Sequence, residues 1–374
     1  MKIAVNVRFL LSGNLEGFGI FSQECMKRIT RSHPEHEFIF FFDRPYDDSF
    51  LFSDNITPQV VYPPARHPLL WKVWFEYSIP YYLKKHKADV FLSLDGYASL
   101  KTEVPTIPVI HDLAFEHYPK DIPRSTANFY RKYFPKYAQK ARRIATVSNY
   151  SKSDIVERYN IPAKKIDVVN NGASSLFHPM SRDEIKSHRQ KVTGGVPYFF
   201  YVGAMHPRKN IANLLKAFDA FCKANAASFR LVLAGRKAWA TTDIETTFET
   251  MEFKDRVIFT GRLSDEALAT YMGAAHALTY VSYFEGFGIP VLEAMQSGVP
   301  VITAHKSSLP EVAGDAGIYA DPFDHEDIAA KMLSLVNDQT LYADAVKKGL
   351  ARSQYFSWDI TAEKLWKCLM LAVQ

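Results

Sequence analysis

The chain has 374 residues, of which 47% are hydrophobic and 23% are charged. That length exceeds what one ordinary hydrophobic core supports, so two domains are expected. The net charge of +5 is mild for a chain of this size, and no recognition-helix pattern, zinc spacing or long basic run accompanies it, which argues against nucleic acid as a partner.

The cysteines and the apolar runs indicate the compartment. Cys25, Cys222 and Cys368 are widely separated and form no CxxC pair, which argues against a disulfide framework and against a zinc site. The N-terminal run from Met1 is expected to be a buried strand rather than a signal peptide. No stretch reaches the roughly 18 apolar residues that span a bilayer. A cytoplasmic protein is expected, or one bound peripherally at the inner face of a membrane.

Short apolar runs of strand length alternate with longer amphipathic stretches, which is the pattern of βα units around a parallel sheet. The strands expected in the first half are Ile3–Phe9, Phe38–Phe42, Val90–Ser93, Ile107–Ile110, Ile144–Val147 and Ile166–Val169. Those expected in the second half are Tyr198–Val202, Leu231–Ala234, Val257–Thr260, Leu278–Val281, Val299–Thr303 and Gly317–Tyr319. Helical patterns include Arg182–Lys191, Ile211–Ala224, Asp265–Ala275 and His325–Asn337.

The break between the two series of strands falls around residues 171–197. Asn171-Gly172 predicts a turn there, and Gly194-Gly195 precede Pro197. We therefore expect an α/β protein with two Rossmann-like domains facing across a cleft, one spanning residues 1–175 and the other residues 195–357.

Ligands of such sheets bind beyond the carboxyl ends of the strands, and the strongest candidate site follows the strand at 278–281. There the segment 285–290 (EGFGIP) leads into a helix that contains Glu293. Gly286 and Gly288 leave backbone amides accessible to a phosphate, and the helix N-terminus directs its free amides to the same place. Glu285 and Glu293 beside such a nest suit a ligand with hydroxyls and phosphates, such as a sugar nucleotide. A plain helix start with a capping glutamate explains the segment equally well.

A second candidate site follows the first strand of the second half. Gly203 opens a turn that carries Arg208 and Lys209 just before an amphipathic helix. A guanidinium beside an ammonium is a strong pair of ligands for a diphosphate. A solvated basic turn is the commoner structure for such a pair, but this turn and the Glu285 turn are expected at the same edge of one sheet.

Several motifs together resemble the retaining glycosyltransferases of family 4, which have the GT-B fold. In the second half they are EGFGIPVLEAM at 285–295, VGAMHPRKNIANLLKAF at 202–218 and SLPEVAG at 308–314. In the first half they are VIHD at 109–112, TVSNYS at 146–151 and NG at 171–172. The resemblance covers nearly the whole chain.

The resemblance implies roles for individual residues. Arg208 and Lys209 would bind the donor diphosphate, Glu285 would contact the transferred sugar, and Glu293 would hold the ribose. His111 would lie near the reacting sugar, so the catalytic set is His111, Arg208, Lys209 and Glu285. The donor-binding set is Gly17, Gly19, Gly203, Arg208, Lys209, Gly286, Phe287, Gly288, Ile289 and Glu293. No metal site is implied.

The sequence departs from the family pattern in two places. The loop at residues 12–19 has no Gly-Gly pair, so Gly17 and Gly19 are expected to bring backbone amides to the diphosphate instead. Ala204 stands where some relatives have an arginine, which places more of the diphosphate charge on Arg208 and Lys209. GT-B relatives also return their last helix to the first domain, and residues 358–374 are expected to do so, although a plain terminal helix fits the pattern equally.

The implied function is transfer of a hexose from a nucleoside-diphosphate sugar in surface polysaccharide synthesis, with retention of configuration. GDP-mannose is the favoured donor, a UDP-hexose is the alternative, and no cofactor is implied. The acceptor is expected to be a glycan or a polyprenyl-diphosphate-linked glycan. Alternatives are another GT-B enzyme (a phosphorylase or a sugar-nucleotide epimerase) and a non-catalytic sugar-nucleotide-binding protein. An NAD(P)-dependent oxidoreductase is disfavoured because no GxGxxG follows the first strand.

Three weaker features have two interpretations each. His111 and Asp112 could form a structural His–carboxylate pair. Ser308 and Glu311 could cap a helix rather than lie near the donor. The stretches Arg66–Lys87 and Phe129–Arg143 interleave aromatic and basic residues, which fits either helices with one buried aromatic side or a face that contacts a membrane. For these two stretches the buried side is the favoured interpretation.

Overall fold

The computed structural model describes residues 1–13, 15–225, 228–235 and 242–374, and Asn14 of the early loop lies outside them. The chain forms two compact units. Met1–Gly172 and Ser357–Gln374 make the N-terminal unit, and Ala173–Phe356 make the C-terminal unit.

The N-terminal unit is built on a parallel sheet of five strands in the order β3-β2-β1-β4-β5. The strands are β1 (Lys2–Asn6), β2 (Glu37–Phe42), β3 (Ile56–Val60), β4 (Val90–Ser93) and β5 (Thr106–Pro108). A parallel pair, β6 (Ile144–Thr146) and β7 (Ile166–Val168), continues it through a bridge between Val109 and Ala145. Its helices are α1 (Gly17–Ser32), α2 (Pro68–Val73), α3 (Ile79–His86), α4 (Ala114–His117), α5 (Arg124–Lys140), α6 (Asn149–Tyr159) and α15 (Trp358–Val373).

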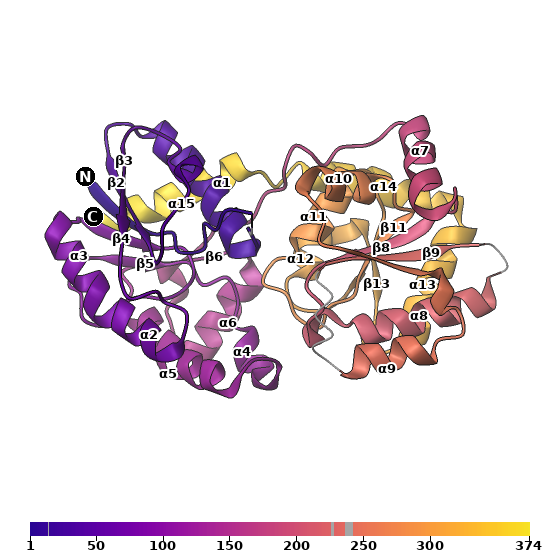
Figure 1. Ribbon diagram of the computed structural model, residues 1–374, viewed down its shortest axis with the longest axis horizontal. Coiled ribbons are helices and arrows are strands. Elements are labelled where there is room, and N and C mark those ends of the chain that lie inside the picture. Colours follow the sequence, from indigo (N-terminus) through magenta and orange to yellow (C-terminus); the bar gives the residue numbers. More distant parts are fainter. Residues whose placement is uncertain (14, 226–227, 236–241) are drawn as a thin grey trace. The chain divides into compact units, whose positions relative to one another are not determined.

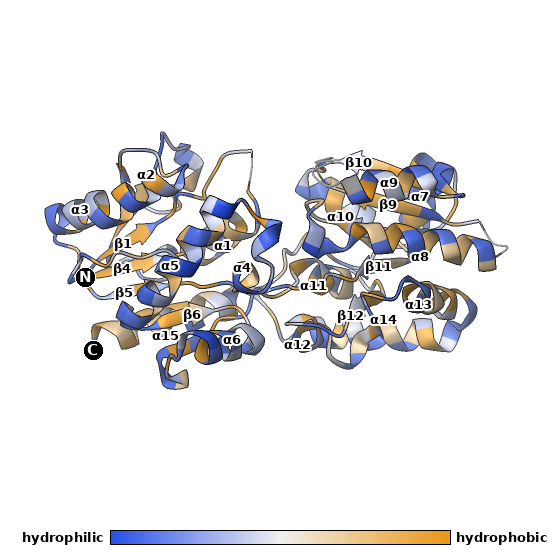
Figure 2. Ribbon diagram, turned by 90° about the horizontal axis from the view of Figure 1, so that it is seen from below, coloured by the Kyte–Doolittle hydropathy of each residue, from blue (hydrophilic) through white to orange (hydrophobic). Residues whose placement is uncertain are grey.

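The inner strands of this sheet are nearly continuous apolar runs because helices cover both of their faces. Ile3, Ala4 and Val5 of β1 are fully buried, in register with Phe38, Ile39 and Phe40 of β2. Figure 2 shows β1 and β4 of this sheet in orange, the colour of hydrophobic residues, while the surrounding helices are mixed.

The C-terminal unit has a parallel sheet of six strands in the order β10-β9-β8-β11-β12-β13. The strands are β8 (Tyr198–Val202), β9 (Arg230–Ala234), β10 (Val257–Gly261), β11 (Ala277–Tyr280), β12 (Val301–Ala304) and β13 (Gly317–Ala320). Its helices are α7 (Arg182–Thr193), α8 (Ile211–Ala224), α9 (Thr242–Thr250), α10 (Asp265–Gly273), α11 (Ile289–Gln296), α12 (Leu309–Ala313), α13 (His325–Asn337) and α14 (Gln339–Ser353). The expectation of two Rossmann-like units is confirmed.

The terminal helix α15 belongs to the N-terminal unit, where it packs beside α1 (Figure 1). Gly172 permits its return, because a Cβ atom at this residue would lie 2.3 Å from the backbone nitrogen of Trp358. The Thr361 hydroxyl donates to the Asn170 carbonyl at 2.5 Å. The Asn171-Gly172 pair therefore marks the place where the chain leaves the unit and where α15 rejoins it.

The strand β3 was absent from the prediction. Its sequence, ITPQV, contains Pro58, which has no N–H to donate to a sheet. β3 is an edge strand that pairs only with β2, so a proline is tolerated there. Among the described residues, no helix combines the length and the apolarity needed to cross a bilayer.

Candidate functional site

The candidate donor site lies where the strand order of the C-terminal sheet reverses. β8 and β11 are neighbours in the sheet although two strands separate them in the chain, and the segments that follow them leave from the same edge. Such a switch point is where open parallel sheets bind ligands. A backbone hydrogen bond joins the two segments, since Tyr283 N–H donates to the Arg208 carbonyl at 2.8 Å.

Glu285 is held by both predicted phosphate ligands. One carboxylate oxygen lies 2.8 Å from Arg208 Nη1 and the other lies 2.6 Å from Lys209 Nζ. Lys209 Nζ also donates to Tyr280 Oη at 2.5 Å, and Arg208 donates to the Phe284 carbonyl at 2.9 Å. The structure therefore brings together three of the four residues of the predicted catalytic set. Tyr280, at the end of β11, is a member of this cluster that the sequence analysis missed.

The electrostatics of this cluster fix the charge of Glu285. Burial alone would raise the pKa of its carboxyl, but Lys209 and Arg208 outweigh burial and lower the pKa to about 2. Glu285 is therefore an anion at any working pH and has no proton to donate. Two cations around one anion leave a net positive charge, so the cluster can accept a ligand that is more negative than a single carboxylate.

Serine hydroxyls position the backbone of the Glu285 loop. Ser307 Oγ accepts from Glu285 N–H at 2.9 Å. The Ser308 hydroxyl is buried, 2.8 Å from the Glu285 carbonyl and 2.9 Å from the Phe287 carbonyl. Ser308 occupies the N-cap position of α12, but its hydroxyl makes no capping bond there, so the predicted side-chain cap is wrong.

The glycine-rich segment reaches the N-terminus of α11 as predicted. Gly288 is the N-cap residue with φ of 102°, and a Cβ atom there would lie 2.8 Å from Leu309 Cδ2, so both conformation and space require glycine. Gly286 is buried beside it and Ile289 begins the helix. The Phe287 side chain packs in the core against Phe356, so only its backbone is available to a ligand. Gly203, after β8, has φ of 149° and passes close to Gly235.

Glu293 lies one turn inside α11 in a different environment from Glu285. It is half-buried, and no basic residue contributes to its titration. Burial, followed by the charge of Asp265, raises the pKa of Glu293 to about 8. The two carboxyls of the segment therefore have opposite properties, an anion held by cations and an acid that keeps its proton at neutral pH.

This shift predicts a pH-dependent stability. We expect Glu293→Gln to raise the midpoint of thermal unfolding, and by more at pH 8 than at pH 5. The folded-state pKa of about 8 lies above the ordinary value of 4.5, so stability is complete below pH 4.5 and falls as pH rises towards 8. Thermal unfolding of both proteins at the two pH values measures the effect. An equal shift at both pH values would show that Glu293 does not titrate in this way.

In the N-terminal unit, His111 follows β5 and is fixed by backbone contacts. Its Nε2 lies 2.9 Å from the Leu94 carbonyl and therefore carries a proton, and burial lowers the pKa of the imidazole. Asp112 accepts from Ala114 N–H instead of bonding the ring, so the alternative of a His111–Asp112 pair is wrong. The Ser151 hydroxyl donates to the His111 carbonyl at 3.0 Å, which gives the TVSNYS motif a structural role. The role of His111 towards a sugar stays a prediction.

Gly17 and Gly19 form the first turn of α1, after β1. No atom lies within 4 Å of a Cβ placed on Gly17, whereas one on Gly19 would lie 2.6 Å from the Phe9 carbonyl. Gly19 is thus required by packing, and a diphosphate contact at either glycine stays a prediction.

The same unit also holds a buried ion pair that the sequence analysis missed. Arg8 Nε lies 2.5 Å from Asp95, at the β1–β4 switch point of that sheet. Each residue lies two positions beyond the end of its strand, and a charged residue just after a buried strand is the signal that could have identified Asp95.

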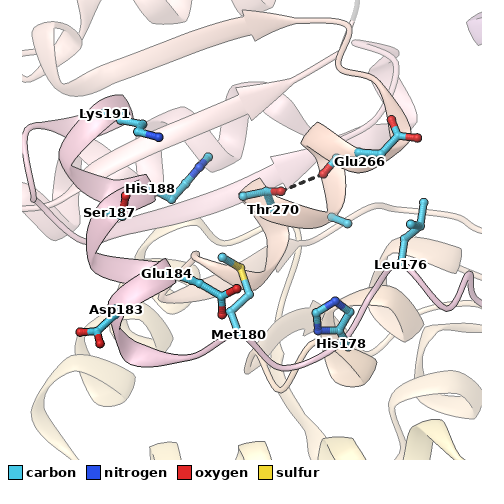
Figure 3. Close-up of a pocket in the computed structure, with 11 residues that line it drawn as sticks. Leu176, His178, Met180, Asp183, Glu184, Ser187, His188, Lys191, Glu266 and Thr270 are labelled. Carbon is cyan, nitrogen blue, oxygen red and sulfur yellow. Dashed lines mark hydrogen bonds between the residues drawn. The ribbon is translucent and has the colours of Figure 1, made fainter.

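A separate cavity of about 600 Å³ opens between α7 and α10 (Figure 3). His188 and Lys191 of α7 and Thr270 of α10 line it, and none of the predicted site residues does. Within the described ranges, no group of three or more His, Cys, Asp or Glu side chains is arranged to hold a metal ion.

Comparison with known proteins covers both units. Residues 183–352 match the family described as "Glycosyl transferases group 1" and residues 29–174 match "Glycosyltransferase Family 4". The O-antigen chain mannosyltransferase B of Escherichia coli is 30% identical over 356 residues, 92% of this chain and 93% of that protein. The O-antigen chain mannosyltransferase RfbU of Salmonella typhimurium is 28% identical over 262 residues, 68% of each chain. Among solved structures, the sucrose-phosphate synthase of Thermosynechococcus elongatus has a TM-score of 0.78 at 19% identity, covering 98% of this chain and 97% of that one.

Proposed function

Since the chain belongs to the group 1, family 4 glycosyltransferases, we propose that it transfers mannose from GDP-mannose, with retention of configuration, to a glycan acceptor of surface polysaccharide synthesis. The family, together with one mannosyltransferase relative that aligns with 92% of this chain, supports its assignment as a hexosyltransferase. That both halves match glycosyltransferase families argues against the oxidoreductase alternative. The choice of mannose follows the relatives that are named O-antigen mannosyltransferases. The single observation that carries the donor assignment is the Arg208–Glu285–Lys209 cluster at the β8–β11 switch point.

Donor binding is proposed to exchange one anion for another. In the free protein the Glu285 carboxylate neutralises part of the charge of Arg208 and Lys209. A diphosphate carries more negative charge and can also use the amides at the N-terminus of α11, so it competes well for the two cations. Glu285, released from them, can accept hydrogen bonds from hydroxyls of the transferred sugar. Glu293, one turn further along, is proposed to bind the ribose hydroxyls.

The chemistry requires stabilisation of the departing diphosphate. As the glycosidic bond breaks, negative charge grows on the diphosphate next to Arg208, Lys209 and the helix amides, and each such donor is worth about 3–4 kcal/mol in the transition state. Retention of configuration is proposed to arise because the acceptor hydroxyl attacks the anomeric carbon on the face from which the diphosphate leaves. An oxygen of the donor phosphate takes the proton of that hydroxyl. Lys209 and Arg208 lower the pKa of Glu285 in the free protein, so the residue meets the donor without a proton to give, which supports a role for its negative charge at the anomeric carbon rather than proton donation.

Measuring the unfolding midpoint of the protein with GDP, UDP, ADP and the corresponding sugar nucleotides would identify the nucleotide that it binds. Ligand that binds only the native state raises the unfolding midpoint by mass action, by about 2.7 kcal/mol of stability at a hundred times Kd. We expect the largest shift with GDP and GDP-mannose. A larger shift with UDP and UDP-hexoses would replace GDP-mannose as the donor, and no shift with any nucleotide would contradict the donor site.

The acceptor is proposed to be a growing glycan, free or linked to a polyprenyl diphosphate. This part of the proposal rests on the relatives named for O-antigen chains. Product analysis with a lipid-linked oligosaccharide and with the same oligosaccharide released from its lipid separates the two cases. Transfer to both at equal rates would show that the lipid is not recognised.

A further inference from the structure

One face of the N-terminal unit exposes a row of large apolar side chains. α2, a π-helical turn (Trp74–Ser78) and α3 form one continuous helical segment along the edge of this unit (Figure 1). At intervals of four residues it exposes Leu69 (71%), Val73 (40%), Tyr77 (57%) and Tyr81 (63%). Tyr62 (60% exposed) is joined to the segment through the Ser78 hydroxyl, which donates to its carbonyl at 2.7 Å. We call these five residues the apolar row.

The geometry of the segment keeps the row on one side. A regular α-helix has 3.6 residues per turn, so four-residue steps drift around its axis. The wider π-helical turn opposes that drift in the middle of the segment. The opposite side is already occupied by core packing, since Trp74, Phe75, Ile79 and Leu83 are fully or almost fully buried. The apolar row is thus not part of the folded core.

Within residues 62–87, the exposed charges beside the row are of one sign. Between residues 62 and 87, every exposed residue outside the row is basic: Arg66, His67, Lys72, Lys84, Lys85 and Lys87. The single acid in this range, Glu76, is buried and accepts from Leu100 N–H at 3.0 Å, so it does not offset them at the surface. Lys101 adds a further cation, with Nζ 3.7 Å from the Tyr77 ring centroid.

The neighbouring helix α5 supplies an internal comparison, because its sequence has the same mixture of aromatic and basic residues. Phe129, Phe134 and Tyr137 of α5 are buried in the core of the unit. The exposed positions of α5 carry only polar and charged side chains, among them Arg124, Lys132 and Lys136. α5 is therefore an ordinary amphipathic helix, as favoured for both stretches, whereas the α2–α3 segment departs from that expectation.

We propose that the apolar row and its lysines dock the protein on the surface of a bilayer that contains anionic lipids. Tyrosine and leucine side chains insert at the level of the headgroups, and flanking lysines extend along them to the lipid phosphates. A helical segment with basic residues near both of its ends, at positions 66–67 and 84–87, matches a negatively charged plane, and no exposed acid within residues 62–87 opposes that attraction. This inference goes beyond the proposed transfer reaction and does not depend on which donor or acceptor is used.

Co-sedimentation with vesicles tests the proposal without donor, acceptor or turnover. We expect the full chain to bind vesicles of phosphatidylethanolamine with 30% phosphatidylglycerol (roughly the anionic fraction that attracts basic segments), and to be released as salt screens the charges. Binding to pure phosphatidylcholine vesicles is expected to be much weaker.

Two triple variants and their matched controls assign the binding to this face. Lys72→Gln, Lys84→Gln and Lys85→Gln together are expected to weaken binding about a hundred-fold, since each basic residue near an anionic surface is worth about five-fold. Leu69→Ser, Tyr77→Ser and Tyr81→Ser together should also abolish co-sedimentation. The charge control, Arg124→Gln, Lys132→Gln and Lys136→Gln on α5, and the exposed-aromatic control Tyr355→Ser should bind as the wild type does.

Three outcomes would overturn the proposal. The first is that the folded wild type does not bind anionic vesicles, which would indicate that the apolar row binds a protein partner instead. Another is equal binding to neutral and anionic vesicles. The third is loss of binding in the α5 variant to the same extent as in the α2–α3 lysine variant, because binding would then reflect net charge alone. Transfer of mannose in solution is measured separately, so failure of either proposal is distinguishable from failure of the other.

Discussion

Replacing Lys209 by alanine is expected to lower kcat for glycosyl transfer by about a hundred- to a thousand-fold, with the fold intact. The ammonium group would stabilise charge that develops on the leaving diphosphate, and removing one such donor costs about 3–4 kcal/mol of transition-state stabilisation. The variant should fold because Glu285 keeps its ion pair with Arg208. Initial rates of transfer at saturating donor and acceptor measure the effect.

Lys216→Ala is the matched control for this variant. Lys216 is exposed on α8 of the same unit, so its loss changes net charge by the same amount without touching the cluster. The control should have wild-type kcat. A Lys209→Ala protein that retains kcat within about five-fold of the wild type would remove Lys209 from the catalytic set.

Replacing Glu285 by glutamine is expected to act in opposite directions on binding and on transfer. In the free protein the carboxylate neutralises Arg208 and Lys209, so its removal leaves both cations for the diphosphate. We expect GDP to bind about ten-fold more tightly, equivalent to about 1.4 kcal/mol, while kcat falls at least a hundred-fold because the negative charge near the anomeric carbon is lost. Titration calorimetry with GDP and the transfer assay measure the two effects.

Glu293→Gln is the control for the tighter GDP binding expected of Glu285→Gln. It tests whether losing any carboxyl from this segment would have the same effect. It removes a carboxyl from the same segment, residues 285–293, without freeing a cation, since neither Arg208 nor Lys209 is a cause of the shifted pKa of Glu293. Its affinity for GDP should not increase. If Glu285→Gln binds GDP no more tightly than the wild type does, the exchange of carboxylate for diphosphate is wrong.

Much of the fold was predictable because local pattern and tertiary environment agree. The inner strands are buried on both faces and so appear in the sequence as continuous apolar runs, and α8 occupies the predicted residues Ile211–Ala224. β3 escaped prediction because Pro58 is excluded from inner strands but not from an edge. Local sequence does not record whether a strand lies at an edge.

The sequence predicted which residues share the site, but not which of their side chains bond to one another. Parallel topology brings the ends of β8 and β11 together, so Arg208, Lys209 and Glu285 were expected at one edge. That Glu285 binds both cations, and that Tyr280 joins them, depends on side-chain directions that the sequence does not contain. The sequence also does not show that the two carboxyls titrate differently, because only their surroundings in the fold separate a pKa of about 2 from one of about 8.

The side-chain directions of the two aromatic-basic stretches were likewise not predictable from the sequence. Residues 66–87 and 129–143 have similar compositions, and composition alone cannot tell which aromatic side chains face the core. In α5 they do, whereas Tyr77 and Tyr81 of the α2–α3 segment are exposed. The difference arises from the direction in which each helix packs.

The most direct test of the proposed function is to incubate the protein with GDP-mannose and a lipid-linked oligosaccharide and to determine the anomeric configuration of the product by NMR. The C1–H1 coupling constant distinguishes α- from β-linked mannose. We predict transfer of one or more mannose residues in α linkage, the configuration of the donor, and transfer that is at least about a hundred-fold slower with the Lys209→Ala protein. A β-linked product, or transfer at the same rate by Lys209→Ala, would contradict the proposed function.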